Sequence, residues 1–334
     1  MNKPLSVSCP RCGTTADRTD NFCETCGLEI AAVRLVAAGA SSASCMSCGS
    51  EQISADGYCE QCGSKAPAAR DHFELDLGTL AGITDRGLRH HRNEDAMALA
   101  ASHTPSGAVA LAAVCDGIST SERPDAASLA AANAALSALL AELRAGAPSD
   151  DALRTAVTAA DTAVRELAAD SLNAPAATFV AAVVSMAEVA TCWVGDSRAY
   201  WLPVGTEHTG ARSLTRDDSL ASALVSAGAL PEDEAIASPH GHVVTRWLGA
   251  DAAELEPHIA TFEPPGPGVV LLCSDGLWNY MPDAAGLSGL ALPKAQSDMR
   301  DAAADLIAFA LRSGGRDNIT AVLIAYPPEL PSSS

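Results

Sequence analysis

Eight cysteines near the N-terminus follow one spacing twice, and this spacing limits how the first part of the chain can fold. Residues 9–27 read CPRCGTTADRTDNFCETCG, and residues 45–63 read CMSCGSEQISADGYCEQCG. Each repeat holds two C-x2-C-G turns, which together place four thiolates around one tetrahedral zinc ion. Because neither repeat is long enough to bury a core, the metal should supply the free energy of folding. The expected ligands are Cys9, Cys12, Cys23 and Cys26 for one ion and Cys45, Cys48, Cys59 and Cys62 for the other.

These zinc sites should be structural and not catalytic, because four protein thiolates leave no open position on the metal. The spacing leaves an interleaved pairing of the two repeats open, and disulfides are the weaker alternative in an intracellular chain. The pair of repeats, residues 1–66, resembles a double zinc ribbon, and we expect it to be either a docking module for a partner or an appendage that packs on the rest of the same chain.

The charge of the chain limits its partners. The chain has 334 residues, with 41 Asp and Glu against 21 Lys and Arg, and a formal net charge of −20. Such a chain repels nucleic acid and anionic membranes on average, so neither is expected as a partner. The N-terminus lacks the apolar core of a signal peptide, and no apolar run approaches the ~20 residues of a membrane span. We therefore expect a cytoplasmic protein.

A different pattern begins after a linker at residues 67–73. Strands in blocks with paired helices indicate an α+β domain, and not the regular alternation of a parallel α/β sheet. Gly146 should end the first helix, and Ser149 should cap the second. Residues 329–334 form a tail that is expected to be disordered. The expected helices cover residues 123–146, 149–169 and 297–313, and the expected strands read LDLGTLAGITD, GAVALAAVCDG, AATFVAAVVSM, EVATCWVGD, RAYWLP, GVVLLCSDG and NITAVLIAYP.

Acidic residues recur at the ends of these strands and in the turns beside them. Asp116 and Asp275 each precede a glycine, so that the carboxylate and the backbone carbonyl could both approach a ligand. Hard divalent cations such as Mg2+ and Mn2+ prefer oxygen ligands and keep several waters. Two such cations would suit water activation and charge neutralisation at a phosphoryl group. The candidate ligands are Glu94, Asp95, Asp116, Asp196, Asp275 and Asp317.

Three further cysteines, Cys115, Cys192 and Cys273, lie in apolar runs. We expect them to be buried structural thiols, as free cysteines commonly are. A redox-sensitive role is the alternative for Cys115 and Cys273, because both lie close to acidic residues.

Several motifs then occur in one order: TDRG, NEDA, VCDG, VGDSRAYW, LTRDDSL, LLCSDGLW and GGRDNITAVLI. In this order, and over residues 75–327, the chain resembles the metal-dependent protein phosphatases (the PPM, or type 2C, serine/threonine phosphatases). The resemblance implies a four-layer α-β-β-α sandwich over residues 74–328, in which helix pairs cover two antiparallel sheets. Residues 217–250 match the flap beside the cleft, where substrate selection is expected.

The resemblance also implies an activity. Phosphoserine and phosphothreonine of protein substrates would be hydrolysed by a water that two Mn2+ or Mg2+ ions activate, without a covalent phosphoenzyme. A serine/threonine kinase of the same cell would be the natural counterpart. The alternative is a phosphatase-like binding or sensor protein with weak or no turnover.

The metal ligands are carried over by motif. Asp116 should bridge the two ions, and Asp275 and Asp317 should complete the site of the first. The Gly117 carbonyl should bind the second ion. Asp196 matches the position that bacterial members use for a weaker third metal. Metal-bound waters should be held, directly or through hydrogen bonds, by Glu94 and Asp95.

The stretch GLRHHRNED departs from the family pattern D-x-G-x-x-R-x-x-N-E-D, because His90 stands where the phosphate-binding Arg is expected. If the stretch is extended, His90, Arg92 and Glu94 share one face, while Arg89 faces away. Arg92 should then contact the phosphate, with His90 as a donor or as the proton source for the leaving alkoxide. Arg89 is the third candidate for the phosphate contact, and a supporting role outside the site is the alternative for His90.

Two further departures concern the loop after Asp116 and the flap. Bacterial members often continue D-G-M-G-G-H, whereas here Ile118, Ser119, Thr120 and Ser121 follow Gly117. In the family pattern LT-x-D-H-S, Asp218 replaces the His. Neither change removes a core metal ligand, so activity is expected to survive with an altered loop shape.

Overall fold

The computed structural model describes the second part of the chain almost completely and the first part only in short pieces. The pieces do not include six of the eight cysteines predicted to bind zinc, nor the tail at 329–334. The described residues are 6–8, 14–17, 25, 50, 52, 54, 59–63, 70–168, 173–205, 210–231, 234–235, 238, 241, 243–252 and 254–328.

Two antiparallel sheets form the centre of the molecule. The six-stranded sheet has the order β11-β10-β14-β15-β4-β3, and the five-stranded sheet has the order β13-β9-β8-β6-β5. The strands of the first are β11 (Arg212–Ser213), β10 (Arg198–Pro203), β14 (Gly268–Cys273), β15 (Ile319–Tyr326), β4 (Leu80–Asp85) and β3 (His72–Asp76). The strands of the second are β13 (His258–Phe262), β9 (Val189–Val194), β8 (Phe179–Ser185), β6 (Gly107–Asp116) and β5 (Asp95–Thr104). Two smaller pairs join β1 (Ser6–Ser8) to β2 (Thr15–Asp17) and β7 (Ala176–Ala177) to β12 (Leu248–Gly249).

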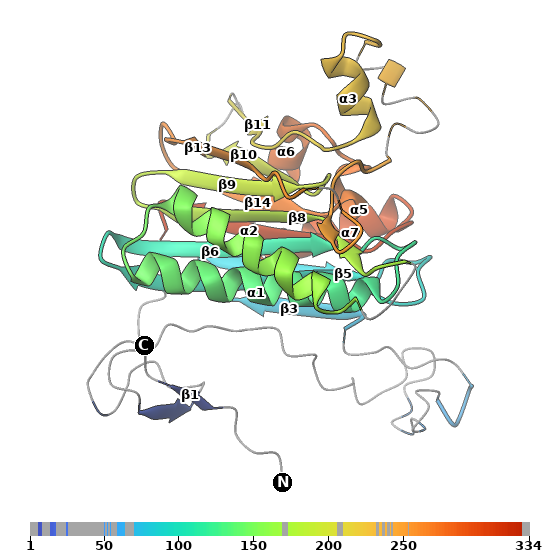
Figure 1. Ribbon diagram of the computed structural model, residues 1–334, viewed down its shortest axis with the longest axis horizontal. Coiled ribbons are helices and arrows are strands. Elements are labelled where there is room, and N and C mark those ends of the chain that lie inside the picture. Colours follow the sequence, from blue (N-terminus) through green and yellow to red (C-terminus); the bar gives the residue numbers. More distant parts are fainter. Residues whose placement is uncertain are drawn as a thin grey trace.

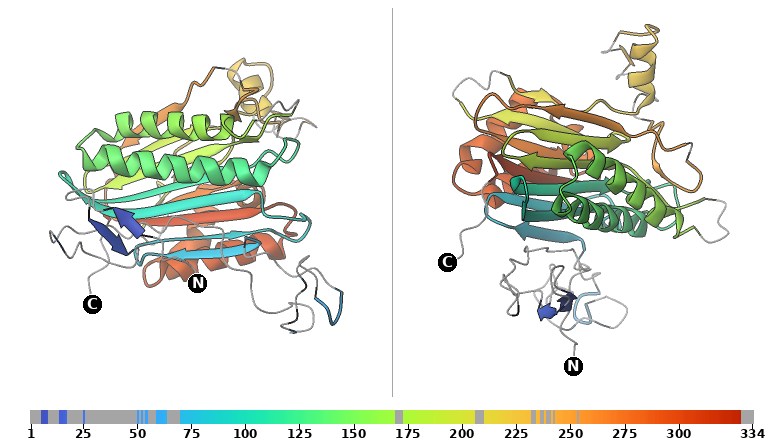
Figure 2. Two further views of the ribbon diagram at one scale, coloured as in Figure 1. Left: turned by 60° about the horizontal axis from the view of Figure 1, so that its bottom comes forward. Right: turned by 60° about the vertical axis from the view of Figure 1, so that its left-hand side comes forward.

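Helices cover the outer face of each sheet, which confirms the predicted α-β-β-α sandwich (Figures 1 and 2). The five-stranded sheet carries α1 (Pro124–Arg144) and α2 (Ser149–Arg165). The six-stranded sheet carries α5 (Asp275–Trp278), α6 (Ala284–Ala295) and α7 (Met299–Arg312). A further helix, α3 (Leu220–Ser226), belongs to the flap and projects beyond the sheets (Figure 2).

The apolar runs of the sequence follow from this layering. Along β8, residues 179, 181 and 183 pack against α1 and α2, whereas residues 180, 182 and 184 pack against the other sheet. Side chains alternate between the faces of a strand, so a strand with both faces buried is apolar throughout. The same strand therefore contributes to two of the three cores.

One described helix, α1, is long and apolar enough by length and composition to cross a membrane, although no such run was expected from the sequence. Half of that apolar window is buried inside the sandwich. Its buried face includes Ala131, Ala135 and Leu139, which pack in the core that the helix shares with the five-stranded sheet.

Helix α1 ends at Arg144, and Gly146 follows with φ +88, as the sequence predicts. The predicted N-cap of α2 is wrong, because Ser149 is the first helical residue and Pro148 occupies the cap position without a side-chain hydrogen bond. The two acidic residues of the first turn, Asp150 and Asp151, instead complement the positive end of the helix dipole.

The observed elements differ from the predicted pattern at several points, and strands β5 and β13 and helices α3 and α5 were not predicted. The stretch LDLGTLAGITD is not one strand, since β3 ends at Asp76 and β4 begins at Leu80. Gly78, at φ +81, donates its N–H to Asp76 Oδ1 over 2.8 Å in the turn between them. Helix α6 was not predicted, because Pro293 and two glycines interrupt its helical pattern. Strand β3 begins at His72, inside the segment taken as a linker.

Candidate metal centre and phosphate site

The predicted acidic residues gather at one end of the sandwich because its strands are antiparallel. Strand β6 ends at Asp116 where β5 begins, so that Asp95 and Asp116 are register partners. In the other sheet, β14 ends at Cys273 opposite Arg198 and Ala321, near the first residues of β10 and β15. The connections that carry Asp196, Asp275 and Asp317 therefore leave or enter the sheets at this same end.

Burial keeps these carboxyl groups from ionising freely. Burial, followed by the neighbouring carboxylates, raises the pKa of Asp116 and of Asp275 well above the ordinary value. Burial also raises the pKa of Asp95 to about 6 and the pKa of Asp196 to about 7. For Asp95, burial raises the pKa more than the hydrogen bonds from Ser274 and Thr320 lower it. A group of acids that resist ionisation together is suited to a compensating cation.

Asp95 is held through one of its two oxygens. Ser274 Oγ donates a hydrogen bond of 2.7 Å to Asp95 Oδ2, and Thr320 Oγ1 does so over the same distance. The other oxygen, Asp95 Oδ1, is buried and has no partner among the described residues, and Asp275 Oδ1 is in the same condition. Buried polar atoms without a partner are costly, and an oxygen-seeking cation or its water would satisfy both. The residues present thus fit a divalent metal.

The glycines after Asp116 and Asp275 are required by close backbone packing. A Cβ atom at Gly117 would lie 2.3 Å from the Pro124 carbonyl oxygen and 2.9 Å from that of Glu94. A Cβ atom at Gly276 would lie 1.9 Å from the Asn318 carbonyl oxygen. Each glycine therefore lets the backbone after an acidic strand end lie against a neighbouring segment of the site.

Asn318 is a site residue that the sequence analysis missed. Its side chain is buried, and its Oδ1 accepts a hydrogen bond of 2.7 Å from the Glu94 backbone N–H. Its Nδ2 donates to the carbonyl oxygens of Arg86 at 2.7 Å and Arg92 at 3.1 Å. Asn318 thereby ties the start of β15 to both ends of the turn that precedes Asp95. The motif GGRDN contains the residue, but its partners lie more than 220 positions away.

Glu94 is held from two sides. Arg92 Nε donates to Glu94 Oε1 over 2.8 Å, and Ser119 Oγ donates to Glu94 Oε2 over 2.5 Å. Ser119 stands in the loop where the family pattern D-G-M-G-G-H predicts glycine. The departure in this loop thus adds a hydrogen bond to the site.

The RHHR stretch is not extended, because residues 87–89 form a turn and residues 91–92 a bend, so the condition for the shared face of His90, Arg92 and Glu94 is not met. Even so, His90 Nε2 lies 3.1 Å from Asp317 Oδ1, and Arg92 contacts Glu94, so both side chains reach the acidic cluster. The side chains of Arg89 and His91 are exposed and make no hydrogen bond or ion pair with the described residues.

Arg70 supports the site from the segment taken as a linker. Its Nη2 donates to the Asp95 carbonyl oxygen at 3.2 Å and to Ser128 Oγ at 3.1 Å. Its own carbonyl oxygen accepts a hydrogen bond of 3.1 Å from Asn93 Nδ2.

The flap is attached beside Asp196. Asp218, the residue in place of the family His, accepts a hydrogen bond of 3.0 Å from the Gly195 N–H and lies 2.8 Å from His258 Nε2. His258 stacks on Trp193 with 5.0 Å between the ring centroids. Next to this group is a hollow of about 430 Å³ that also includes Arg216 and Arg246.

The remaining cysteines carry less information. Cys115, Cys192 and Cys273 are fully buried, and burial raises the pKa of each thiol, which supports the predicted structural role. Of the predicted zinc ligands, Cys59 and Cys62 are described, and the Gly63 N–H donates to the Cys59 carbonyl oxygen at 2.8 Å in a tight turn. Within the described ranges, no three Cys, His, Asp or Glu side chains form a ready-made set of metal ligands. Waters and the Gly117 carbonyl would have to complete the coordination of a cation.

Two families match this chain by sequence. The family described as Protein phosphatase 2C matches residues 86–311, and the family described as Double zinc ribbon matches residues 5–63. The second match covers the predicted cysteine repeat.

Individual relatives agree with these matches. The serine/threonine phosphatase stp of Listeria innocua is 33% identical over 154 residues, which are 46% of this chain and 58% of that protein. The serine/threonine protein phosphatase PstP of Mycobacterium tuberculosis is 30% identical over 249 residues, which are 73% of this chain and 44% of that protein. The chain thus spans 58% of the length of the first curated relatives it matches.

A solved structure shares the fold. The crystal structure of the catalytic domain of PstP in complex with 2 manganese ions matches with a TM-score of 0.56 and 27% identity. The match covers 74% of this chain and 97% of that one.

Proposed function

The chain belongs to the protein phosphatase 2C family, and we propose that it is a serine/threonine protein phosphatase that uses two divalent cations. The observation that carries the proposal is the partly buried acidic cluster, in which Asp95 and Asp275 each have one buried oxygen without a partner among the described residues. Such a cluster requires positive charge, and a crystallised relative holds 2 manganese ions. The substrates would be proteins that carry phosphoserine or phosphothreonine.

The ligands would be divided between two sites for Mn2+ or Mg2+. Asp116 would serve both ions, with Asp275 and Asp317 at the first and the Gly117 carbonyl at the second. Asp196 would hold a weaker third ion. When bound, the cations supply Lewis-acid chemistry that lowers the pKa of water and neutralises charge on the phosphoryl group. The carboxyl groups with raised pKa values would release their protons on metal binding.

The other residues of the site would orient the reactants. Asp95 is fixed by Ser274 and Thr320, so its unpartnered oxygen is kept for a ligand or a water. Arg92 uses Nε to hold Glu94, while half of its side chain is exposed, so its two terminal nitrogens are available to a phosphate. His90 would act as a positioning residue for Asp317, which it contacts directly.

The N-terminal part would bind two structural zinc ions, one in each cysteine repeat. The match to the double zinc ribbon family and the turn at Cys59 support this assignment. We place the enzyme in the cytoplasm, opposite a serine/threonine kinase, with the ribbons as a docking module for a partner. Elemental analysis of the full chain should find two zinc ions per molecule, and a lower content after Cys59→Ser.

The enzymatic proposal is tested by hydrolysis of p-nitrophenyl phosphate with and without added Mn2+. The full chain should be active only with Mn2+ or Mg2+, and Asp275→Asn should be at least about a hundredfold slower. Thr158→Ala, an exposed change on α2, should leave the rate unchanged. Activity that persists after metal is removed, or equal activity of Asp275→Asn, would contradict the proposal of metal-dependent catalysis, whereas no activity with Mn2+ would favour the binding protein.

A further inference from the structure

The arginines of this chain are not used equally. Most of the described arginines pair with a carboxylate, a carbonyl oxygen, a hydroxyl or an aromatic ring. The described arginines whose guanidinium groups make no hydrogen bond, ion pair or ring contact are Arg89, Arg123, Arg154, Arg312 and Arg316. In a chain with 41 acidic residues and 21 Lys and Arg, cations without a partner are unexpected.

Three of these arginines border the acidic cluster. Arg316 directly precedes Asp317, and Arg89 directly precedes His90. The turn of Arg89 lies against the segment of Arg316, because the Leu88 N–H donates to the Gly315 carbonyl oxygen at 2.8 Å. Arg123 lies near the strand end that carries Asp116, because the carbonyl of the next residue, Pro124, packs against Gly117. We call these three exposed residues, Arg89, Arg123 and Arg316, the arginine rim.

Arg123 also has an unusual backbone. It is the described non-glycine residue with a positive φ, at +51, and it precedes a proline. The left-handed region is unfavourable for a residue that carries a side chain. A residue that precedes a proline also favours an extended backbone over a helical one. The exposed Glu122 beside it forms no ion pair with it. The backbone conformation of Arg123 therefore costs conformational free energy, at a position where the side chain is exposed to solvent.

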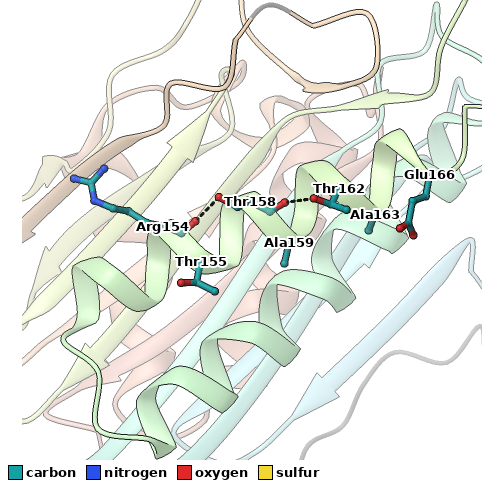
Figure 3. A pocket seen from close by; sticks show the side chains of 7 residues that line it. All are labelled: Arg154, Thr155, Thr158, Ala159, Thr162, Ala163 and Glu166. Atoms are coloured by element: carbon teal, nitrogen blue, oxygen red, sulfur yellow. Dashed lines mark hydrogen bonds between the residues drawn. The ribbon is translucent and has the colours of Figure 1, made fainter.

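The two remaining arginines lie on helices that cover the sheets. Arg312 is in the last turn of α7, where a cation complements the helix dipole. Arg154 projects from the outer surface of α2, beside a hollow lined by Thr155, Thr158 and Glu166 (Figure 3). Because α2 covers the outer face of the five-stranded sheet, Arg154 is a matched control for the rim.

We propose that the arginine rim binds acidic residues that flank the phosphorylated residue of a protein substrate. This inference rests on the proposed function, since it assumes that the phosphoryl group lies at the acidic cluster. A substrate chain in extended form advances ~3.3 Å per residue, so residues two or three positions from the phosphorylated one pass over the edge of the site. The net charge of −20 repels an acidic substrate at long range, and the rim offsets this repulsion within about one Debye length, ~8 Å. The substrate class is therefore an acidic phosphopeptide segment.

The test compares two phosphopeptides of equal length. One carries Asp and Glu on both sides of the phosphothreonine, and the other carries Asn and Gln at the same positions. At low ionic strength the full chain should hydrolyse the acidic peptide with a kcat/KM about five- to twentyfold higher, and added salt should reduce this preference. The double variant Arg123→Ala/Arg316→Ala should lose at least threefold of the preference, whereas Arg154→Ala should retain it. Arg89 is left unchanged because it also remains a candidate for the phosphate contact.

Hydrolysis of p-nitrophenyl phosphate, which has no flanking residues, serves as the internal control. The rim variant should keep the wild-type rate on it, which shows that the variant is folded. If the wild type fails on this substrate with Mn2+, the proposed function fails. If it succeeds but shows no preference between the peptides, or if the rim variant keeps the preference, the rim proposal alone is overturned. Rim-dependent inhibition by a single-stranded oligonucleotide, with no peptide preference, would overturn it in favour of a nucleic-acid surface.

Discussion

The imidazole Nε2 of His90 lies 3.1 Å from Oδ1 of Asp317, so the residue in place of the expected arginine contacts a predicted metal ligand. The Asp317 side chain is 42% exposed, which is the most open position among the acidic residues of the cluster that form ion pairs. His90 therefore restrains a carboxylate that solvent would otherwise leave free to move. We expect Arg92, two positions on, to supply the cationic contact to the phosphate.

Replacing His90 and replacing Arg92 should impair different steps: the first should weaken metal binding, and the second should weaken substrate binding. His90→Ala should raise the Mn2+ concentration needed for half-maximal activity about three- to tenfold, because Asp317 loses its restraint. Arg92→Ala should raise the KM for a phosphopeptide with neutral flanks about tenfold, because a charge-assisted contact is lost. Both are measured by titrating metal and substrate separately.

Arg89→Ala is the control for this pair and should have a much smaller effect on the same KM. His90→Asn, which can still donate to Asp317, should recover part of the metal affinity. Equal small changes in KM from Arg89→Ala and Arg92→Ala would refute the assignment of Arg92.

Asp275→Asn should make the protein more stable without metal and less responsive to it. Burial and the neighbouring acids raise the pKa of Asp275 well above its ordinary value, so the charged form is disfavoured in the metal-free fold at pH 7.5. A neutral amide removes that repulsion, and the Tm of the metal-free variant should exceed that of the wild type. Adding Mn2+ should raise the Tm of the wild type only. A lower Tm of the metal-free variant would show that Asp275 is stabilising without a cation.

Asn318→Ala should destabilise the fold by about 2–4 kcal/mol, because it leaves the buried Glu94 N–H and two carbonyl oxygens without their partner. Urea unfolding measures this loss. Activity should fall as well, since the turn before Glu94 is no longer tied to β15. Asn279→Ala, which removes one exposed hydrogen bond to Asp275, is the comparison and should cost less than half as much. A loss below about 1 kcal/mol for Asn318→Ala would show that the turn is held by other contacts.

His72 should make stability depend on pH in the alkaline range. Its hydrogen bond to Asp85 raises its pKa from 6.5 to about 9. The unfolded chain loses this proton near pH 6.5 and the folded chain near pH 9, so the stabilisation is complete below pH 6.5 and disappears as the pH rises through 9. Since the side chain is half exposed, the effect should stay below about 1 kcal/mol. The difference in unfolding free energy between wild type and His72→Gln should shrink from pH 6 to pH 9.5, whereas Thr158→Ala, which changes no titratable group, should show no trend.

The layers of the fold were predictable because a strand that is buried on both faces has apolar residues along its whole length, and this run is visible in the sequence. Strand β8 is apolar for this reason and was predicted, as was the long apolar pattern of helix α1. Helix α6 left no such trace, since Pro293 and its glycines weaken the helical pattern that tertiary packing then overrides.

The acidic residues of the site were predictable because each stands in a recognisable motif at or beside one end of a strand. The residues that hold them were not, because hydrogen bonds across long sequence separations have no local pattern. Arg70 donates a hydrogen bond to the Asp95 carbonyl oxygen from a segment predicted to be a linker. Ser119 donates to Glu94 from a loop whose sequence departs from the family pattern. The conformation of residues 87–92 was mistaken because alternation applies only to a strand, and this stretch is a turn.

The flap, residues 217–250, is fixed at both of its ends. At its start, Arg198 makes two hydrogen bonds to the Asp217 carboxylate, at 2.8 and 2.7 Å. At its end, β12 pairs with β7, and the Gly249 N–H donates to Asp161 at 3.0 Å. The segment between these two anchors is therefore a cassette. We expect that its sequence could be exchanged for that of a relative while the strand ends that carry the acidic residues keep their places, and that such an exchange would alter the choice of phosphoprotein substrate.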